Sequence, residues 1–232
     1  GFSGVWDVLD GEHNVLIALS TDPKPEEMVA ELGSRYLVTE TAIKPFSVGY
    51  PIQAPLDALL RLRREHALSV DNVERIVVRL PEDGARVVND RAMPDVNCQH
   101  IIALALVEGT VSFGDSHSYE RMADPKVRAV KERVQLIADR DLMDPAAPRS
   151  GRVEVTLRDG RTVSHFTRHA PGTTENPMDT ESVNAKARLL MAPVLGAEQT
   201  EGVIRRVNAL EALADVRELR PFLARAGQSA NR

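Results

Sequence analysis

A hairpin signal in the second half of the chain constrains the fold more than any other feature. Residues 151–169 read GRVEVTLRDGRTVSHFTRH, and apolar and polar side chains alternate on both sides of Asp159-Gly160. Alternation with a period of two is typical of a strand with one buried face, and Asp-Gly suits a tight turn between antiparallel strands. The chain is therefore expected to contain antiparallel strands that pack one face on a core.

Strand and helix patterns alternate before this hairpin. Residues 73–81 (VERIVVRLP) predict a largely buried strand, and residues 135–138 predict a possible second one. Helices are expected where apolar residues recur at helical spacing or where capping residues and proline occur, over residues 22–32, 54–65 and 97–108, and from residue 124 onward.

The pattern changes after residue 178, because the rest of the chain contains helical patterns and no strand candidate. Thr180 and Ser182 are candidate caps of the first of these helices, and residues 198–213 carry one apolar face. The sequence therefore predicts an α+β fold, a small mixed domain with antiparallel strands and packed helices followed by a C-terminal helical segment. The predicted divisions are residues 1–40 as a connecting segment, 41–170 as the α+β domain, 171–178 as a Pro/Gly/Thr-rich linker and 179–232 as the helical segment.

The composition excludes several functional classes. With 43% hydrophobic and 27% charged residues the chain is globular, and a net charge of −5 without a basic patch argues against a nucleic-acid partner. The single cysteine, Cys98, excludes an internal disulfide, and no Cys/His spacing resembles a zinc site. No apolar run approaches the roughly 20 residues that span a bilayer. A soluble, cytoplasmic protein without membrane contact is expected.

The common catalytic motifs are absent. No glycine-rich phosphate loop, Gly-x-Ser-x-Gly elbow or His-Glu-x-x-His pair occurs, so no cofactor and no metal are expected. His100 precedes an apolar helix and could have a site role, although a lone histidine there is more often structural. Cys98 is interpreted as a small buried side chain, and Asp95 and Asn97 as helix caps.

Lys44 has more unusual surroundings. It follows the short run Thr41-Ala42-Ile43 and precedes a stretch rich in Pro, Gly and Ser that leads to a helix starting near Ala54-Pro55. Free N–H groups of that first helical turn and the Lys44 ammonium could face one volume and form an anion site. Alternatively, Lys44 marks the end of an edge strand and its charge lies in solvent. The residues alone leave both interpretations open.

The segment AIKPFSVGYPIQAPLDALL around Lys44 resembles the signature of the MmgE/PrpD family, the group that contains 2-methylcitrate dehydratase and cis-aconitate decarboxylase. Further blocks that are similar to the family occur in the same order along most of the chain: GFSGVWDVLDGEHN, CQHIIALALVEGTV, ADPKVRAVKERV, VEVTLRDGRTV and PGTTENPMDTESVNAKARLL. The resemblance implies a large helical domain and a smaller α+β lid, with the chain returning to the helical domain at its end. This sequence then corresponds to the lid and the returning tail, and residues 1–40 to a segment that connects them to a missing helical domain.

The resemblance also implies a chemistry without metal or organic cofactor. Lys44 matches the family's lid lysine, whose implied role is to bind a substrate carboxylate and to stabilise an enolate-like intermediate. Many members have a histidine nine positions later, where this chain has Gln53, a residue that cannot transfer a proton at neutral pH. Tyr50 stands where many members have arginine, and His100 matches the position before the apolar helix. The departure at Gln53 puts 2-methylcitrate itself in question as the substrate.

We therefore expect a cofactor-independent hydro-lyase that abstracts a proton next to a carboxylate of a small hydroxy-polycarboxylic acid. The expected catalytic residues are Lys44 and His100, and the expected substrate-binding residues are Gln53 and Tyr50. The general base is expected in the helical N-terminal half, either missing from this sequence or supplied as a separate chain, and a homodimer is implied. The alternatives are a decarboxylase or epimerase of the same family, and a non-catalytic lid that binds carboxylates or a partner.

Overall fold

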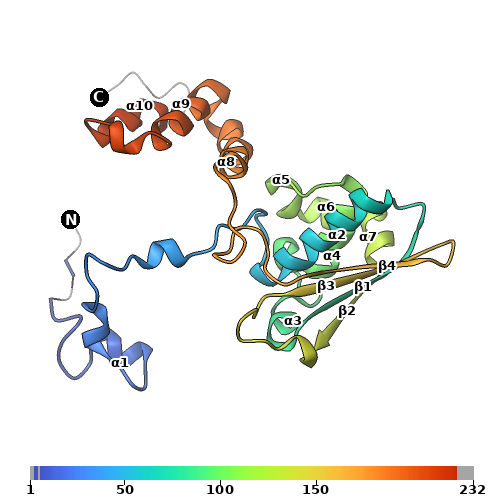
Figure 1. Ribbon diagram of the computed structural model, residues 1–232, viewed down its shortest axis with the longest axis horizontal. Coiled ribbons are helices and arrows are strands. Elements are labelled where there is room, and N and C mark those ends of the chain that lie inside the picture. The colour runs from blue at the N-terminus through green and yellow to red at the C-terminus, as the bar shows by residue number, and fades with distance from the viewer. Residues whose placement is uncertain (1–2, 5, 224–232) are drawn as a thin grey trace. The chain divides into compact units, whose positions relative to one another are not determined.

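The computed structural model of the 232-residue chain describes residues 3–4 and 6–223 (Figure 1). Its contacts divide the chain into two compact units, Gly1–Thr41 and Ala42–Arg232. The second unit contains the sheet, the helices that cover it and the C-terminal helices.

The first unit contains little regular structure. Its described residues form one short helix, α1 (Val15–Leu19), and two 3₁₀ turns, η1 (Pro25–Met28) and η2 (Leu37–Glu40). The helix expected over residues 22–32 is wrong, since only η1 forms there. None of the described residues of this unit is buried, so no tertiary packing stabilises a helix that is too short to form by propensity alone.

The second unit is built on a four-stranded mixed sheet with the strand order β2-β1-β3-β4. The strands are β1 (Val73–Pro81), β2 (Val134–Asp139), β3 (Gly151–Leu157) and β4 (Thr162–Thr167). β1 pairs with β2 in parallel, and β3 pairs antiparallel with both β1 and β4. The β3–β4 hairpin confirms the prediction made from the sequence, and Gly160 at its turn has a φ of +87° that favours glycine.

The helices of the α+β region precede β1 or lie between the strands. They are α2 (Gln53–His66), α3 (Glu82–Val88), α4 (Cys98–Glu108), α5 (Phe113–Ser116), α6 (Tyr119–Ala123) and α7 (Pro125–Lys131), with 3₁₀ turns η3 (Tyr50–Ile52), η4 (Pro94–Val96) and η5 (Arg140–Leu142). Asn97 caps α4 as expected, by accepting a bond from the His100 N–H, and α4 ends at Gly109 in the left-handed conformation. Asp124 caps α7 in the same way. The predicted helices over residues 54–65 and 97–108, and the one from residue 124, are therefore confirmed.

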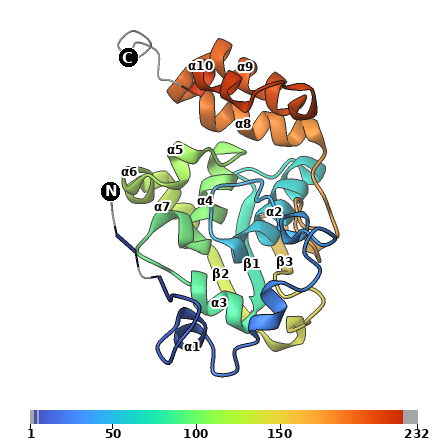
Figure 2. The same ribbon diagram turned by 90° about the vertical axis from the view of Figure 1, so that its left-hand side faces the viewer.

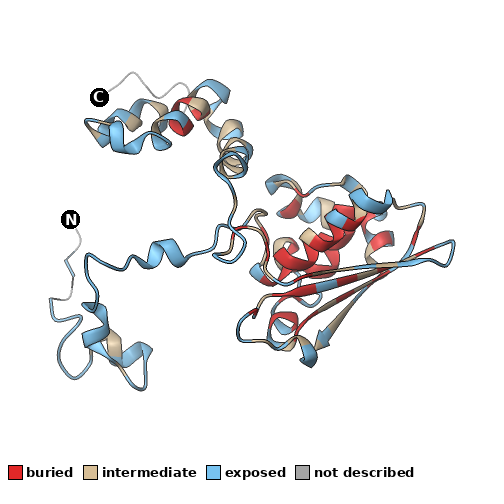
Figure 3. Ribbon diagram, viewed as in Figure 1, coloured by how far each residue is buried: buried red, intermediate tan, exposed pale blue. Residues whose placement is uncertain are grey.

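The core lies between α2, α4 and one face of the sheet (Figure 3). Strand residues that point to this face, including Ile76, Val78 and Val155, are fully buried. α4 is buried along almost its whole length, which explains its uniformly apolar sequence. The other face of the sheet is polar, and there Arg79 pairs with Glu154 at 3.3 Å. A mixed sheet with helices on its apolar face agrees with the predicted α+β class.

The C-terminal helices pack against one another (Figure 2). They are α8 (Thr180–Leu195), α9 (Ala197–Val207), η6 (Leu210–Ala212), η7 (Val216–Leu219) and α10 (Arg220–Leu223). Asp179 caps α8 by accepting a bond of 2.7 Å from the Ser182 N–H, so the expected caps Thr180 and Ser182 are wrong. The side chain of Arg188 links α8 to Glu201 of α9. None of the described helices is long and apolar enough to cross a membrane.

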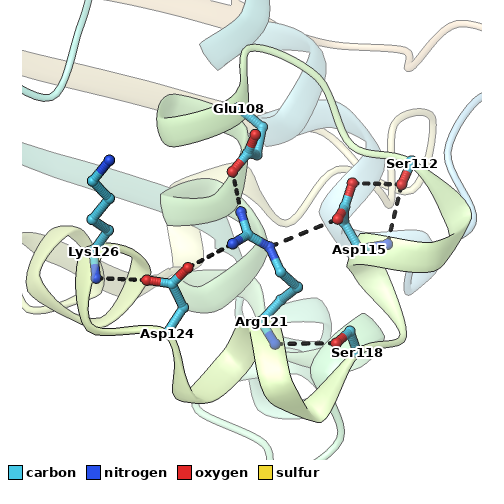
Figure 4. Close-up of polar contacts among 7 residues, drawn as sticks. All are labelled: Glu108, Ser112, Asp115, Ser118, Arg121, Asp124 and Lys126. Atoms are coloured by element: carbon cyan, nitrogen blue, oxygen red, sulfur yellow. Dashed lines mark hydrogen bonds and ion pairs between the residues drawn. The ribbon is translucent and has the colours of Figure 1, made fainter.

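Arg121 joins the short helices α5, α6 and α7 to the end of α4 (Figure 4). Its side chain is 26% exposed, and the guanidinium pairs with Glu108 at the end of α4, with Asp124 at the start of α7, and with Asp115 of α5 at 3.7 Å. Three carboxylates around one planar, permanently charged group hold it in one orientation. The cluster thus fixes three helices that are too short to be stable alone.

Replacement of Gly151 by alanine tests how closely β3 approaches α2. A Cβ at position 151 would lie 2.7 Å from Pro55 Cδ and 2.9 Å from Pro55 N, and the backbone atom cannot move aside. We expect Gly151→Ala to reduce the free energy of unfolding by about 1–3 kcal/mol through overpacking. Urea unfolding measures the change, and Gly114→Ala is the control because its Cβ would meet only Ser112 Oγ, at 3.9 Å. Equal stability of both variants would contradict the close approach.

Candidate functional site

The loop that carries Lys44 is held in shape by one buried amide. Gln53, the first residue of α2, is 1% exposed. Its Nε2 donates to the carbonyl oxygens of Phe46 at 2.9 Å and Val48 at 3.2 Å, and its Oε1 accepts from the Phe46 N–H at 3.3 Å. Residues 42–48 belong to no helix or strand, so these bonds satisfy backbone groups that regular structure would otherwise pair.

Lys44 lies on the surface of this loop. Its ammonium donates to the carbonyl oxygen of Val48 at 3.1 Å, the same oxygen that accepts from Gln53. The side chain is exposed, and the residue does not end a strand, so the edge-strand alternative is not what the structure contains. The loop thus presents a cation whose position is set by a carbonyl that is itself held by Gln53.

Two further backbone contacts pin the loop at its ends. The Ile43 N–H donates to the Gly172 carbonyl at 2.8 Å, and the Gly49 N–H donates to the Asp95 carbonyl at 2.8 Å. Gly172 has a φ of +90°, and a Cβ there would lie 1.8 Å from the Ile43 oxygen, so the contact requires glycine. Segments far apart in the sequence therefore determine where Lys44 lies.

The start of α2 differs from the expectation. The 3₁₀ turn η3 precedes the helix directly, so the Ile52 N–H donates to the Gly49 carbonyl at 2.9 Å and the Gln53 N–H donates to the Tyr50 carbonyl. These two N–H groups are consequently not free to bind an anion beside Lys44. Any anion at this loop would depend on the lysine charge more than on the helix terminus.

The structure brings together three of the four predicted site residues. Lys44, Tyr50 and Gln53 belong to one loop and the helix start that follows it, and Tyr50 is 38% exposed. Gln53, however, uses both ends of its amide on the loop backbone. The roles predicted for these residues towards a substrate stay predictions.

His100 has a different environment, because it belongs to α4 and its side chain lies in the core. Its side chain is fully buried, and neither ring nitrogen has a hydrogen-bond partner among the residues that the structure describes. Burial, together with the positive charges of Lys131 and Arg121, lowers the pKa of His100 to about 4. The imidazole is therefore neutral at pH 7 and is surrounded by packing side chains. The catalytic role predicted for His100 stays a prediction. None of the hydrogen bonds that hold the Lys44 loop involves the His100 ring.

Lys186 of α8 is a residue that the sequence reasoning missed. Its ammonium donates to the backbone carbonyl oxygen of Lys44, across 142 positions of sequence. The only sequence signal was its place in the block PGTTENPMDTESVNAKARLL, where nothing distinguished it from a solvated helix residue. Gly172 lies in the same block, within the predicted linker, and no sequence signal marks its contact with Ile43.

Other parts of the described chain contain weaker candidates for a functional site. No group of three or more His, Cys, Asp or Glu side chains within residues 3–4 and 6–223 is arranged to hold a metal ion. A surface cavity of about 430 Å³ is lined by Asp90, Gln99, Met122, Arg128, Lys131, Glu132 and Val134, and none of the predicted site residues lines it. The Lys44 loop is therefore the best candidate site.

Comparison with known proteins gives a consistent result. Residues 46–211 match the family model described as the MmgE/PrpD C-terminal domain. The chain is 24% identical to a cis-aconitate decarboxylase-like protein, oryM, of Aspergillus oryzae, over 94% of this chain and 49% of that protein. It is 27% identical to the cis-aconitate decarboxylase of Mus musculus, over 76% of this chain and 38% of that protein. The chain thus spans about half the length, or less, of these curated relatives.

Replacement of Gln53 by leucine tests the loop clamp. The variant leaves the Phe46 N–H and carbonyl without the Gln53 amide and leaves the Val48 carbonyl with Lys44 alone, and we expect it to lower the free energy of unfolding by about 2 kcal/mol. Hydrogen exchange at the Phe46 amide should accelerate at the same time. The control is Gln135→Leu, because that glutamine is exposed on β2. Unchanged exchange at Phe46 would show that the loop does not depend on Gln53.

The buried imidazole of His100 predicts a pH-dependent stability. The pKa of His100 in the folded state lies below the unfolded value of about 6.5. As the pH falls, the unfolded chain therefore binds more protons at this histidine than the folded chain does. The contribution of the neutral His100 ring to the free energy of unfolding is therefore present above pH 6.5 and is lost progressively as the pH falls from 6.5 to 4. We expect wild type to lose about 2 kcal/mol more than His100→Leu between pH 7 and pH 5 in urea unfolding. Identical pH profiles of the two proteins would contradict a neutral buried imidazole.

Proposed function

The chain belongs to the MmgE/PrpD family, and from that premise we propose that it forms the C-terminal part of a lyase acting on a small polycarboxylic acid. The observation that carries the proposal is the Lys44 ammonium on a loop whose backbone is pinned by Gln53, Gly172 and Asp95. The family contains dehydratases and decarboxylases, so the class of reaction is consistent with the relatives.

A fixed cation suits this chemistry. Removal of a proton from a carbon next to a carboxylate moves negative charge onto the carboxylate oxygens, and this charge makes the step slow in water. A lysine held in place before the reaction stabilises that charge without having to reorganise. We propose that Lys44 binds the substrate carboxylate next to the reacting carbon and stabilises the enolate-like intermediate.

Proton transfer requires a group that the Lys44 loop does not contain. Gln53 has no proton to transfer at neutral pH, and its amide is engaged with the loop. His100 is neutral and its ring is fully buried. We therefore propose that the general base lies in a helical part of the enzyme outside residues 1–232.

Two reactions of the same class remain candidates. A hydro-lyase would take a proton from carbon and expel hydroxide as water with a second proton, which leaves an unsaturated acid. The names of the two relatives favour decarboxylation as the second candidate. There the carbon–carbon bond breaks, carbon dioxide leaves, the electron pair moves into the conjugated acid and a proton is taken up at carbon. Lys44 would stabilise the carboxylate charge in both.

A panel of acids distinguishes the two reactions. Citrate, 2-methylcitrate, malate and cis-aconitate are incubated with the chain alone and with the chain joined to the helical half expected from the relatives. Proton NMR detects unsaturated products, and a carbon dioxide assay detects decarboxylation. Turnover of any of these acids supports the lyase. Carboxylate binding without any turnover would support the non-catalytic lid instead.

Replacement of Lys44 by methionine tests the proposed role directly. We expect kcat to fall by about 100-fold or more because one charge-stabilising group is removed, while the melting temperature stays nearly unchanged because the side chain is exposed. Lys126→Met is the matched control, since Lys126 is an exposed lysine on α7. Unaltered kcat in Lys44→Met would remove this lysine from the mechanism.

A further inference from the structure

Lys186 places a second positive charge at the Lys44 loop. It lies near the middle of α8, and its ammonium donates to the Lys44 carbonyl oxygen. Lys186 is half-buried, whereas Lys44 is exposed. The two lysines come from segments separated by most of the α+β region, so their meeting is produced by the tertiary fold.

Among the described residues, the two ammonium groups lack the carboxylate partners that several other cations have. Lys131 pairs with Asp90, and Arg188, two positions after Lys186, pairs with Glu181 and Glu201. Within the described residues, no carboxylate lies in ion-pair distance of the Lys44 or the Lys186 ammonium; both donate to backbone carbonyls instead. Neighbouring like charges repel, and burial together with Lys44 lowers the pKa of Lys186.

We propose that Lys186 is a second cationic contact of the carboxylate site, so that this site selects acids with two or more carboxylates. The inference rests on the proposed function and deepens it. Lys44 takes the carboxylate next to the reacting carbon, and Lys186 takes a second carboxylate of the same molecule. A lysine ammonium on a flexible stem can turn from the Lys44 carbonyl to a ligand, and the ligand then neutralises the repulsion between the two lysines.

A purely structural role of Lys186 predicts a different outcome. If Lys186 only held the Lys44 carbonyl, its loss would displace Lys44 and weaken the binding of every carboxylate by a similar factor. If it contacts the ligand, its loss weakens only acids that carry a second carboxylate. Comparing acids with different numbers of carboxylates therefore distinguishes a Lys186 that only positions Lys44 from a Lys186 that contacts the ligand.

The test measures binding of acetate, succinate and propane-1,2,3-tricarboxylate to the complete chain by calorimetry at constant ionic strength, because salt screens such contacts. The proteins are wild type, Lys186→Met, Lys186→Arg, Lys44→Met and the control Lys126→Met. We expect Lys186→Met to weaken succinate and the tricarboxylate by about tenfold and to leave acetate unchanged, since a charge-assisted contact is lost. Lys186→Arg should retain most of the affinity, and Lys44→Met should weaken all three acids.

Several results would overturn the inference. They are equal weakening of all three acids in Lys186→Met, unchanged binding in that variant, and a wild-type protein that binds the tricarboxylate no more tightly than acetate. The melting temperature of each variant verifies that it is folded. Because the test measures binding alone, a lack of turnover would count against the proposed function and leave this inference standing. Turnover together with equal weakening of all three acids in Lys186→Met would support the proposed function and overturn this inference.

Discussion

The hydrogen bonds of the Gln53 amide are the interaction on which the candidate site depends. Gln53 is the first residue of α2, and the residues that follow it pack into the core with almost no exposure. Its side chain therefore connects a rigid helix to the backbone of a loop that has no regular structure, through Phe46 and Val48. If the loop moved away, the buried amide would lose these partners without gaining water, and the protein would be destabilised by the full desolvation free energy of the amide. The loop and the helix therefore stabilise one another.

The described cations have more than one kind of partner, and Arg91 and Arg133, like the lysines of the candidate site, donate to backbone carbonyl oxygens. Arg121, Lys131 and Arg188 are paired with carboxylates and join one helix to another or to a loop. Lys44 and Lys186 instead meet backbone carbonyl oxygens, which satisfy a donor without neutralising its charge. Carboxylates that hold Arg121 and Lys131 in place also keep these two cations near His100, whose buried ring is neutral. Carboxylates thus compensate the charge of Arg121, Lys131 and Arg188, whereas the two lysines of the candidate site have no such partner among the described residues.

The family match and the geometry of the loop concern different parts of the candidate site. The family match covers residues 46–211, which include the Gln53 clamp and Lys186 but not Lys44 itself. The connection of Lys44 to the matched region comes from the structure, where Val48 and Gly172 hold the preceding residues in place. The proposed role of Lys44 therefore rests on the position of a cation that the structure connects to the matched region.

The sequence by itself determined the local elements and the family. The β3–β4 hairpin, the strands β1 and β2, and the helices α2, α4 and α7 were predictable because alternation, helical spacing and capping residues act over a few neighbouring positions. The same local rules failed over residues 22–32, where the helix signal was present but no burial stabilises it. Only the tertiary structure decided the strand order, the burial of His100, the use of Gln53 as a clamp and the meeting of Lys44 with Lys186. Each of these depends on contacts between segments distant in sequence, and periodicity carries no information about such contacts.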